Sequence, residues 1–138
     1  MAVVTEYLQL STSGDCDIAD ITPQVQEKLR ASGLTSGLVT VSAVGSTAAV
    51  TTCEYEPGLV RDIKDIFDAL VPRGEYHHDR AWGDGNGHSH LRASLVGPSL
   101  TIPFDNGALI LGTWQQIIFI DFDNRGRRRQ VAVQVMGE

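Results

Sequence analysis

The segment from Ala108 to Phe122, which reads ALILGTWQQIIFIDF, limits the possible folds of this chain more than any other stretch. Its apolar side chains fall on both faces of an extended chain. Even-numbered positions include Trp114, Ile118 and Ile120, and odd-numbered positions include Ile117 and Phe119. A strand that is apolar on both faces is normally covered on both faces. We therefore predict one long central strand, Ala108–Phe122, with Trp114 buried.

Turn signals flank this segment on both sides. Asp105-Asn106-Gly107 predicts a tight hairpin that joins it to a strand over Ser99–Phe104. Asp123 to Gly126 predicts a turn into a last strand over Arg129–Met136, where Val131, Val133 and Val135 alternate with polar or small residues. Three consecutive strands joined in this way would form a meander, which a purely parallel doubly wound sheet does not contain. The predicted class is α+β, a mostly antiparallel β-sandwich.

Two helices and three more strands complete the predicted domain, residues 1–138. The first helix has Thr22 as its N-cap and Pro23 as its first residue, and it ends at Gly33. The second begins at Pro57 and places its apolar residues on one stripe. β-Branched residues predict strands over Val3–Leu10, Gly37–Val44 and Ala48–Thr52, the last two being either separate or one long bent strand.

Charge and composition narrow the classes of partner. A formal net charge of -6 repels nucleic acid, and the basic cluster of Arg125 and Arg127 to Arg129 falls in a predicted turn. No apolar run approaches the roughly 20 residues that cross a bilayer, and the first residues lack the pattern of a secretory signal. We expect a cytoplasmic protein without a membrane partner. Cys16 and Cys53 form no CxxC motif and are expected to be free thiols.

All four histidines lie in the segment Tyr76–Gly97, YHHDRAWGDGNGHSHLRASLVG. Clustered imidazoles are typical of a site for a divalent ion such as zinc. His88 and His90 would point about 200° apart inside a helix, so we expect the glycines before His88 to keep it in extended backbone and let the pair converge. His78 is the predicted third ligand, with Asp79 or Asp84 as a further ligand or orienting group. The alternative is a loop of solvated histidines without an ion.

The same segment also allows a phosphate site. A helix running through Ser89–Val96 behind a glycine-rich loop would present free N–H groups to an anion, and Arg92 is placed to assist. The loop GDGNG is equally consistent with simple turns. The sequence therefore predicts a phosphorylated small-molecule ligand here as a second possibility.

Three further places carry candidate site residues. Glu54 is a candidate acid or base, although a carboxylate near the start of a helix also has a purely electrostatic explanation. Ser46 and Thr47 could hold an anion, or simply turn the chain between strands. Thr113 and Gln115 interrupt an apolar strand and therefore need either buried partners or a ligand.

Three ordered motifs resemble the YjbQ-like family: GSTAAVTTCEYEPG, YHHDRAWGDGNGHSHLRASLVGPSLTIPF and NGALILGTWQQIIFIDFDNRGR. The resemblance extends over nearly the whole chain. It implies an α+β sandwich that assembles as a homotrimer. The activity assigned to the family is that of a secondary thiamine-phosphate synthase, which joins hydroxymethylpyrimidine diphosphate to thiazole phosphate.

The resemblance also implies roles for individual residues. The family's His-Asp pair corresponds to His78 and Asp79, its later histidine to His90, its glutamate to Glu54, and its Gly-Thr-Trp-Gln to 112–115. Two positions depart from the family pattern. Gly45 stands where many members have histidine, and Cys53 stands where they have asparagine. If position 45 is catalytic, activity is lost or altered here, and His88 is a candidate replacement.

Two hypotheses about function follow. The first is an enzyme acting on phosphorylated small molecules, in which a divalent ion or helix-end amides hold phosphate and a histidine or Glu54 transfers protons. The second is a trimeric module that binds a metal or a phosphorylated ligand without turnover.

Overall fold

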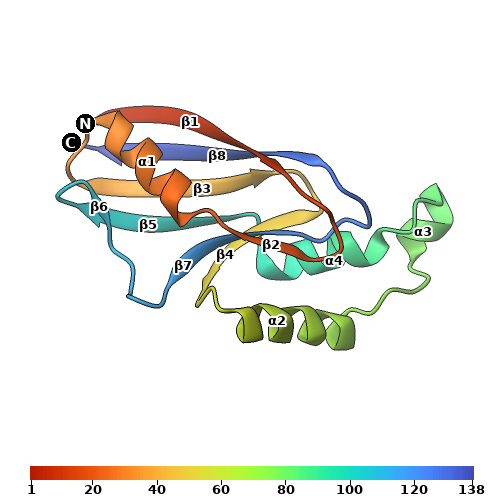
Figure 1. Ribbon diagram of the computed structural model, residues 1–138. Coiled ribbons are helices and arrows are strands. Elements are labelled where there is room, and N and C mark those ends of the chain that lie inside the picture. The colour runs from red at the N-terminus through yellow and green to blue at the C-terminus, as the bar shows by residue number, and fades with distance from the viewer.

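The computed structural model describes all 138 residues and consists of two antiparallel sheets and four helices (Figure 1). The larger sheet has the strand order β1-β8-β3-β5-β6, and the smaller has the order β2-β7-β4. The strands are β1 (Ala2–Ser11), β2 (Asp17–Asp20), β3 (Gly37–Val44), β4 (Ala48–Cys53), β5 (Ser99–Asp105), β6 (Ala108–Leu109), β7 (Gln116–Asp121) and β8 (Arg128–Gly137). The helices are α1 (Thr22–Ser32), α2 (Pro57–Leu70), α3 (His77–Trp82) and α4 (Gly87–Val96). The predicted α+β class with antiparallel sheets is confirmed.

The main core lies between the two sheets. Alternation directs one face of each strand into it, which explains why Val131, Val133 and Val135 of β8 are all fully buried. From the opposite sheet, β7 contributes Ile117 and Phe119. α1 adds its apolar stripe to the same core. Burial of this kind stabilises a domain by roughly 25 cal/mol per Å² of apolar surface.

A second, smaller core lies on the other face of the β2-β7-β4 sheet. Ile118 and Ile120 of β7 pack there beneath α2 and α4. The rings of Phe67 from α2 and Phe122 meet edge to face, with their centroids 4.9 Å apart. β7 is thus buried on both faces, which confirms this part of the prediction for residues 116–121.

The rest of the predicted long strand is wrong, because Ala108–Leu109 and Gln116–Asp121 belong to different sheets. The hairpin holds β6 on β5, whereas β7 pairs with β2 and β4. The connection turns at Gly112, whose carbonyl accepts a hydrogen bond from the Gln115 N–H (3.0 Å). Trp114 is 72% exposed rather than buried. An apolar pattern specifies burial, but it does not say which sheet buries a segment.

The closing meander is also absent. β8 follows β7 in the chain, yet it lies between β1 and β3 in the larger sheet. The hairpin prediction itself is confirmed, because Asn106 and Gly107 adopt φ of 51° and 72° and Phe104 pairs with Leu109. β2 was not predicted. It follows Asp15 and Cys16, whose positive φ values reverse the chain.

The outer face of the larger sheet has no helix or sheet packed on it. The strands β1, β3 and β8 leave Val3, Tyr7, Leu38, Val44 and Met136 exposed there. The neighbouring positions on this face are mainly threonine, serine and glutamine. No helix of the protein combines the length and the apolar character needed to cross a membrane.

Candidate functional site

The histidine segment folds into two helices, α3 and α4, which are joined by residues 83–86. Asp79 fixes this arrangement, because its carboxylate accepts hydrogen bonds from the backbone N–H groups of Tyr76 (3.1 Å) and Gly87 (2.8 Å). These two bonds lower the pKa of Asp79. Gly87 permits the contact, since a Cβ there would stand 3.0 Å from the carboxylate. Asp79 thus ties the beginnings of both helices together.

His88 does not take the extended conformation predicted for it. It is the second residue of α4 and is 2% exposed. Because His88 and His90 lie two positions apart in one helix, their side chains diverge by about 200°. The structure therefore does not bring His88 together with His78 and His90. Burial lowers the pKa of His88, and its Nδ1 has no hydrogen-bond partner.

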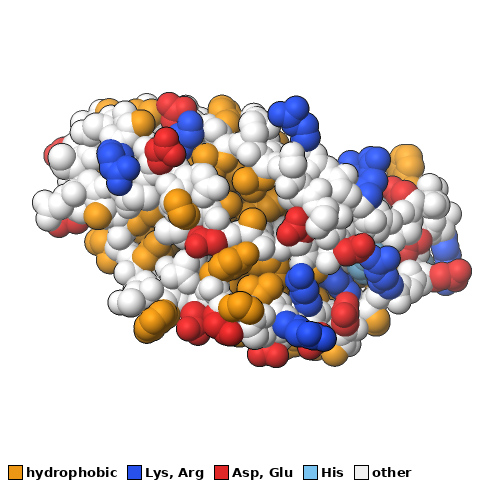
Figure 2. Space-filling view, in the orientation of Figure 1, with side chains coloured by type: hydrophobic (Ala, Val, Ile, Leu, Met, Phe, Trp, Pro, Cys, Tyr) orange, Lys and Arg blue, Asp and Glu red, His pale blue; other side chains and the backbone are white.

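His78 instead gathers with two carboxylates. Its Nδ1 lies 3.7 Å from Asp79 Oδ1 and 3.8 Å from Asp84 Oδ1, and one donor atom from each of the three residues falls within 4.8 Å of the others. The His90 ring packs against the His78 ring with centroids 4.5 Å apart. His78 Nδ1 has no hydrogen-bond partner. We call these four residues the His78 cluster. Figure 2 shows charged side chains of both signs crowding the end of the molecule that carries α3.

A polar pocket of about 310 Å³ adjoins the His78 cluster. It shares Asp84 and His90 with the cluster, and no hydrophobic residue lines it. Its other walls come from three segments: the turn between β3 and β4, the residue before α4, and the segment that leads from β7 into β8. These contribute Gly45, Ser46 and Thr47, then Asn86, and then Asp123, Arg127 and Arg129. The predicted residues Ser46 and Thr47 thus line the same pocket as His90.

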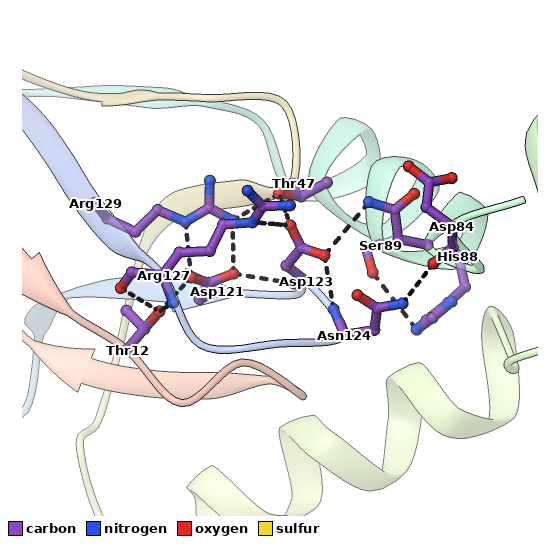
Figure 3. A network of polar contacts seen from close by, with 11 residues as sticks. Thr12, Thr47, Asp84, His88, Ser89, Asp121, Asp123, Asn124, Arg127 and Arg129 are labelled. Atoms are coloured by element: carbon purple, nitrogen blue, oxygen red, sulfur yellow. Dashed lines mark hydrogen bonds and ion pairs between the residues drawn. The ribbon is translucent and has the colours of Figure 1, made fainter. Parts of the chain in front are cut away.

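A buried network of arginine and aspartate side chains forms the floor of this pocket (Figure 3). Arg129 donates from Nε and Nη2 to the two oxygens of Asp121, at 2.7 and 2.8 Å. Arg127 Nε and Thr47 Oγ1 both donate to Asp123 Oδ2, at 2.5 and 3.1 Å. Burial opposes ionisation of Asp121 and Asp123, but these and further hydrogen bonds outweigh it and lower the pKa of both carboxyls.

Asn86, Asp123, Arg127 and Arg129 line the pocket but are not among the site residues predicted from the sequence. The sequence predicts only a turn for the basic cluster, and the alternate spacing of Arg127 and Arg129 is the signal that could have indicated a shared side. Arg127 and Arg129 are two positions apart, so they project to the same side as the chain enters β8. The first lies just before the strand and the second is inside it.

Glu54, Thr113 and Gln115 lie elsewhere. Ser46 and Thr47 precede β4 and Glu54 follows it, so the intervening strand separates them by about 20 Å. Glu54 and Thr113 line a different pocket, of about 360 Å³, together with Trp114 and Gln116. Gln115 bridges the Gly112 N–H and Thr52 Oγ1. Within one chain these residues do not join the His78 cluster.

The prediction that Arg92 assists phosphate binding is corrected. Arg92 is 4% exposed and lies in the middle of α4 rather than at its start. Its Nε donates to the carbonyl of Val71 (2.9 Å), and its Nη2 donates to Asp68 (3.2 Å). The guanidinium therefore holds α4 to the end of α2 and does not line the polar pocket.

Comparison with known proteins gives consistent matches. The family model described as "UPF0047 protein YjbQ-like" matches residues 6–138. A UPF0047 protein of Methanothermobacter thermautotrophicus is 40% identical over 139 residues, which cover 100% of this chain and 95% of the relative. UPF0047 protein YugU of Bacillus subtilis is 37% identical over 131 residues, covering 94% and 97%.

Solved structures agree with these sequence matches. A crystal structure of a protein of unknown function from Sulfolobus solfataricus P2 has a TM-score of 0.93 at 30% identity and covers 99% of each chain. A hypothetical protein from Aeropyrum pernix K1 has a TM-score of 0.91 at 36% identity, covering 98% of this chain and 99% of the other.

Proposed function

Since this chain belongs to the YjbQ-like UPF0047 family, we propose that it is a cytoplasmic enzyme that acts on phosphorylated small molecules with the help of a divalent ion. The observation that carries the proposal is the meeting of the His78 cluster with the polar pocket through Asp84 and His90. The specific reaction proposed is thiamine-phosphate synthesis. In it, hydroxymethylpyrimidine diphosphate and thiazole phosphate are joined and pyrophosphate is released.

The proposed ion site uses His78, Asp79 and Asp84 and leaves the fourth position to water or a ligand. Four ligands about 2.0–2.1 Å from zinc in a tetrahedron stand roughly 3.4 Å apart. The separations of 3.7 and 3.8 Å around His78 Nδ1 are within a few tenths of an ångström of that spacing. Asp84 is exposed on the 83–86 loop and can close the difference. The unpartnered His78 Nδ1 supports the assignment, because a buried nitrogen normally has a partner.

A bound ion would supply the charge that this chemistry requires. Pyrophosphate becomes a good leaving group once its negative charge is neutralised, so few reactive side chains are needed. Asp79 is already oriented by two backbone N–H groups, and its lowered pKa keeps it anionic. His90 faces both the cluster and the pocket, which suits it for proton transfer to or from a bound ligand.

A binding protein without turnover is the second candidate function. The observation that favours it is the position of Glu54, which lies at the far end of β4 from the His78 cluster. Gly45 also leaves the pocket without a histidine from the β3–β4 turn. A single chain therefore offers fewer proton-transfer groups than the resemblance implies.

A homotrimer is the assembly that we propose. The support is the open outer face of the larger sheet, where Val3, Tyr7, Leu38, Val44 and Met136 are exposed among uncharged residues. Exposed apolar side chains on a sheet face that carries few charges are typical of a protein–protein contact. The occupant that we propose for this face is the same chain, because copies related by symmetry can cover it in each protomer.

Elemental analysis tests the ion site. Protein purified without chelators is expected to carry close to one divalent ion per chain. His78→Ala should lose most of it, because that change removes the nitrogen shared by both carboxylate contacts. His77→Ala is the matched control, since His77 is the exposed neighbour. Full metal content in His78→Ala, or none in the wild type, would contradict the site.

A turnover assay separates the two candidate functions. The metal-loaded protein is incubated with hydroxymethylpyrimidine diphosphate and thiazole phosphate, and thiamine phosphate and pyrophosphate are quantified. Thiamine phosphate and pyrophosphate formed in equal amounts, and in smaller amounts by His90→Ala, would support the synthase. Binding of either precursor without product, at protein concentrations that exceed the substrate, supports the binding protein.

A further inference from the structure

We infer that Arg127, Arg129 and Asn86 form a preorganised subsite for the phosphate group of a ligand that also carries an N–H or O–H donor. The inference rests on the proposed function only in taking the ligand to be phosphorylated. It goes further by assigning the subsite to guanidinium groups rather than to the ion or to a helix end.

Both guanidinium groups keep unused donors at the polar pocket. Arg129 uses Nε and Nη2 on Asp121 and Thr47, and its Nη1 has no hydrogen-bond partner. A Cβ at Gly45 would lie 2.9 Å from that Nη1, so glycine leaves the nitrogen uncovered. Arg127 uses only Nε of its side chain, on Asp123, and its side chain is 34% exposed. Its two terminal nitrogens are therefore free to donate.

The two aspartates do not cancel this donor capacity. Asp121 and Asp123 are 0% and 1% exposed, and every one of their four oxygens already accepts a hydrogen bond from the protein. Their charges offset the cost of burying Arg129 and hold both guanidinium planes in place. From this network, only N–H donors of the two arginines remain directed at the pocket, and the Asp84 carboxylate lines it as well. Fixed guanidinium donors suit a phosphate, which accepts two parallel hydrogen bonds.

Asn86 indicates that the ligand also carries a hydrogen-bond donor. It is 5% exposed and lines the pocket, and its Oδ1 has no partner. Its Nδ2 donates to Asp123 Oδ1 (3.4 Å), which fixes the orientation of the amide, because the flipped form would set two oxygens against each other. A buried carbonyl oxygen without a donor destabilises the protein. An amino or hydroxyl group beside the phosphate would satisfy it.

The direct test measures binding of inorganic phosphate by isothermal titration to chelator-treated protein, so that no divalent ion contributes. Loss of the free Arg127 donors in Arg127→Gln is expected to weaken phosphate binding about tenfold or more, the usual effect of losing a hydrogen bond to a charged group. The phosphate affinity of Arg127→Lys should lie between those of the wild type and Arg127→Gln. Arg125→Gln is the matched control, because it removes the same charge from the same turn at an exposed position outside the pocket.

The second arm tests the donor group. Ethanolamine phosphate and glycerol phosphate are expected to bind several-fold more tightly than methyl phosphate, which has no N–H or O–H beyond the phosphate. Equal affinities for the three esters would overturn the role of Asn86. Melting temperatures of the variants show whether weaker binding comes from loss of the fold. Ser46→Ala is a second variant at the pocket wall, and it removes none of the proposed donors or acceptors of the subsite.

These outcomes separate the inference from the proposed function. Phosphate binding that disappears in Arg127→Gln but persists in metal-free His78→Ala supports the guanidinium subsite, whatever becomes of the ion. Phosphate binding that requires the ion and is unchanged in Arg127→Gln would overturn the subsite and leave the proposed ion site intact. Phosphate binding that is unchanged in Arg127→Gln in the absence of any ion would also overturn the subsite. The arginine and aspartate network would then only stabilise the fold.

Discussion

At the scale of single residues, the buried charged side chains have the largest effect on stability. Asp121 is completely buried, and its two carboxylate oxygens each accept a hydrogen bond from Arg129. Removing one member of such a pair costs roughly 3–5 kcal/mol, because the other charge is left buried without a partner. The network therefore ties the integrity of the pocket to the stability of the fold around it.

The lowered pKa of Asp121 predicts how stability responds to acid. Because the folded-state pKa lies below the unfolded value of about 3.9, the stabilisation is fully present above that value and is lost as pH falls through the folded-state pKa. Urea unfolding measured from pH 7 to pH 3 should show a loss of unfolding free energy confined to the acidic end. Asp121→Asn should flatten this loss while lowering stability at pH 7. An equally steep acid limb in that variant would contradict the assignment.

The two cysteines should differ in reactivity. Burial raises the pKa of Cys16 to about 11, and the residue is 3% exposed. Cys53 is only partly buried. Since the thiolate is the reactive form, we expect a disulfide reagent at pH 8 to label Cys53 first and Cys16 only after unfolding. Mass spectrometry of the labelled protein identifies the site. Rapid modification of Cys16 in native protein would mean that the β2 region opens.

At the scale of elements, α4 combines two roles. Its first turn carries His88 inward and His90 towards the pocket, and its middle fastens the helix to α2 through Arg92. The 110–115 connection is the contrasting element, because it crosses between sheets and leaves Ile110 and Trp114 exposed. An aromatic side chain in such a connection adds little to the stability of its own chain.

Trp114→Ala is therefore expected to change the unfolding free energy of the protomer by less than about 1 kcal/mol, as surface substitutions do. Phe119→Ala, the comparison variant in the main core, should cost about 3–5 kcal/mol. Urea unfolding at low protein concentration measures both. A large loss in Trp114→Ala that grows with protein concentration would place the ring at a contact between chains.

At the scale of the whole molecule, the open face of the larger sheet predicts the assembly. Light scattering should return three times the 15.0 kDa chain mass. Leu38→Lys places a charge on that face and should shift the population to monomer. Leu95→Lys is the control, because Leu95 is 67% exposed on α4, away from this sheet. A wild-type protein that remains monomeric at micromolar concentration would contradict the proposed interface.

Local signals in the sequence determined much of the fold. The turn chemistry of Asn106-Gly107 set the hairpin, Pro57 set the start of α2, and the valine alternation of β8 set its dry face. These features depend on backbone preferences and on side-chain period, which neighbouring residues specify by themselves. The same local evidence predicted an ion site in the histidine segment with His78, His88 and His90 as ligands, and the structure brings His78 together with Asp79, Asp84 and His90 but not with His88.

Tertiary structure decided the rest. Whether β7 pairs beside β6 or crosses to the other sheet depends on partners distant in the chain, and so Trp114 is exposed although its pattern predicted burial. The start of α4 depends on the Gly87 N–H reaching Asp79, eight residues earlier, and it turned His88 away from His78. Arg127 and Arg129 became site residues only because the entry to β8 lies against the β3–β4 turn, a contact between segments about 80 residues apart that no local pattern encodes.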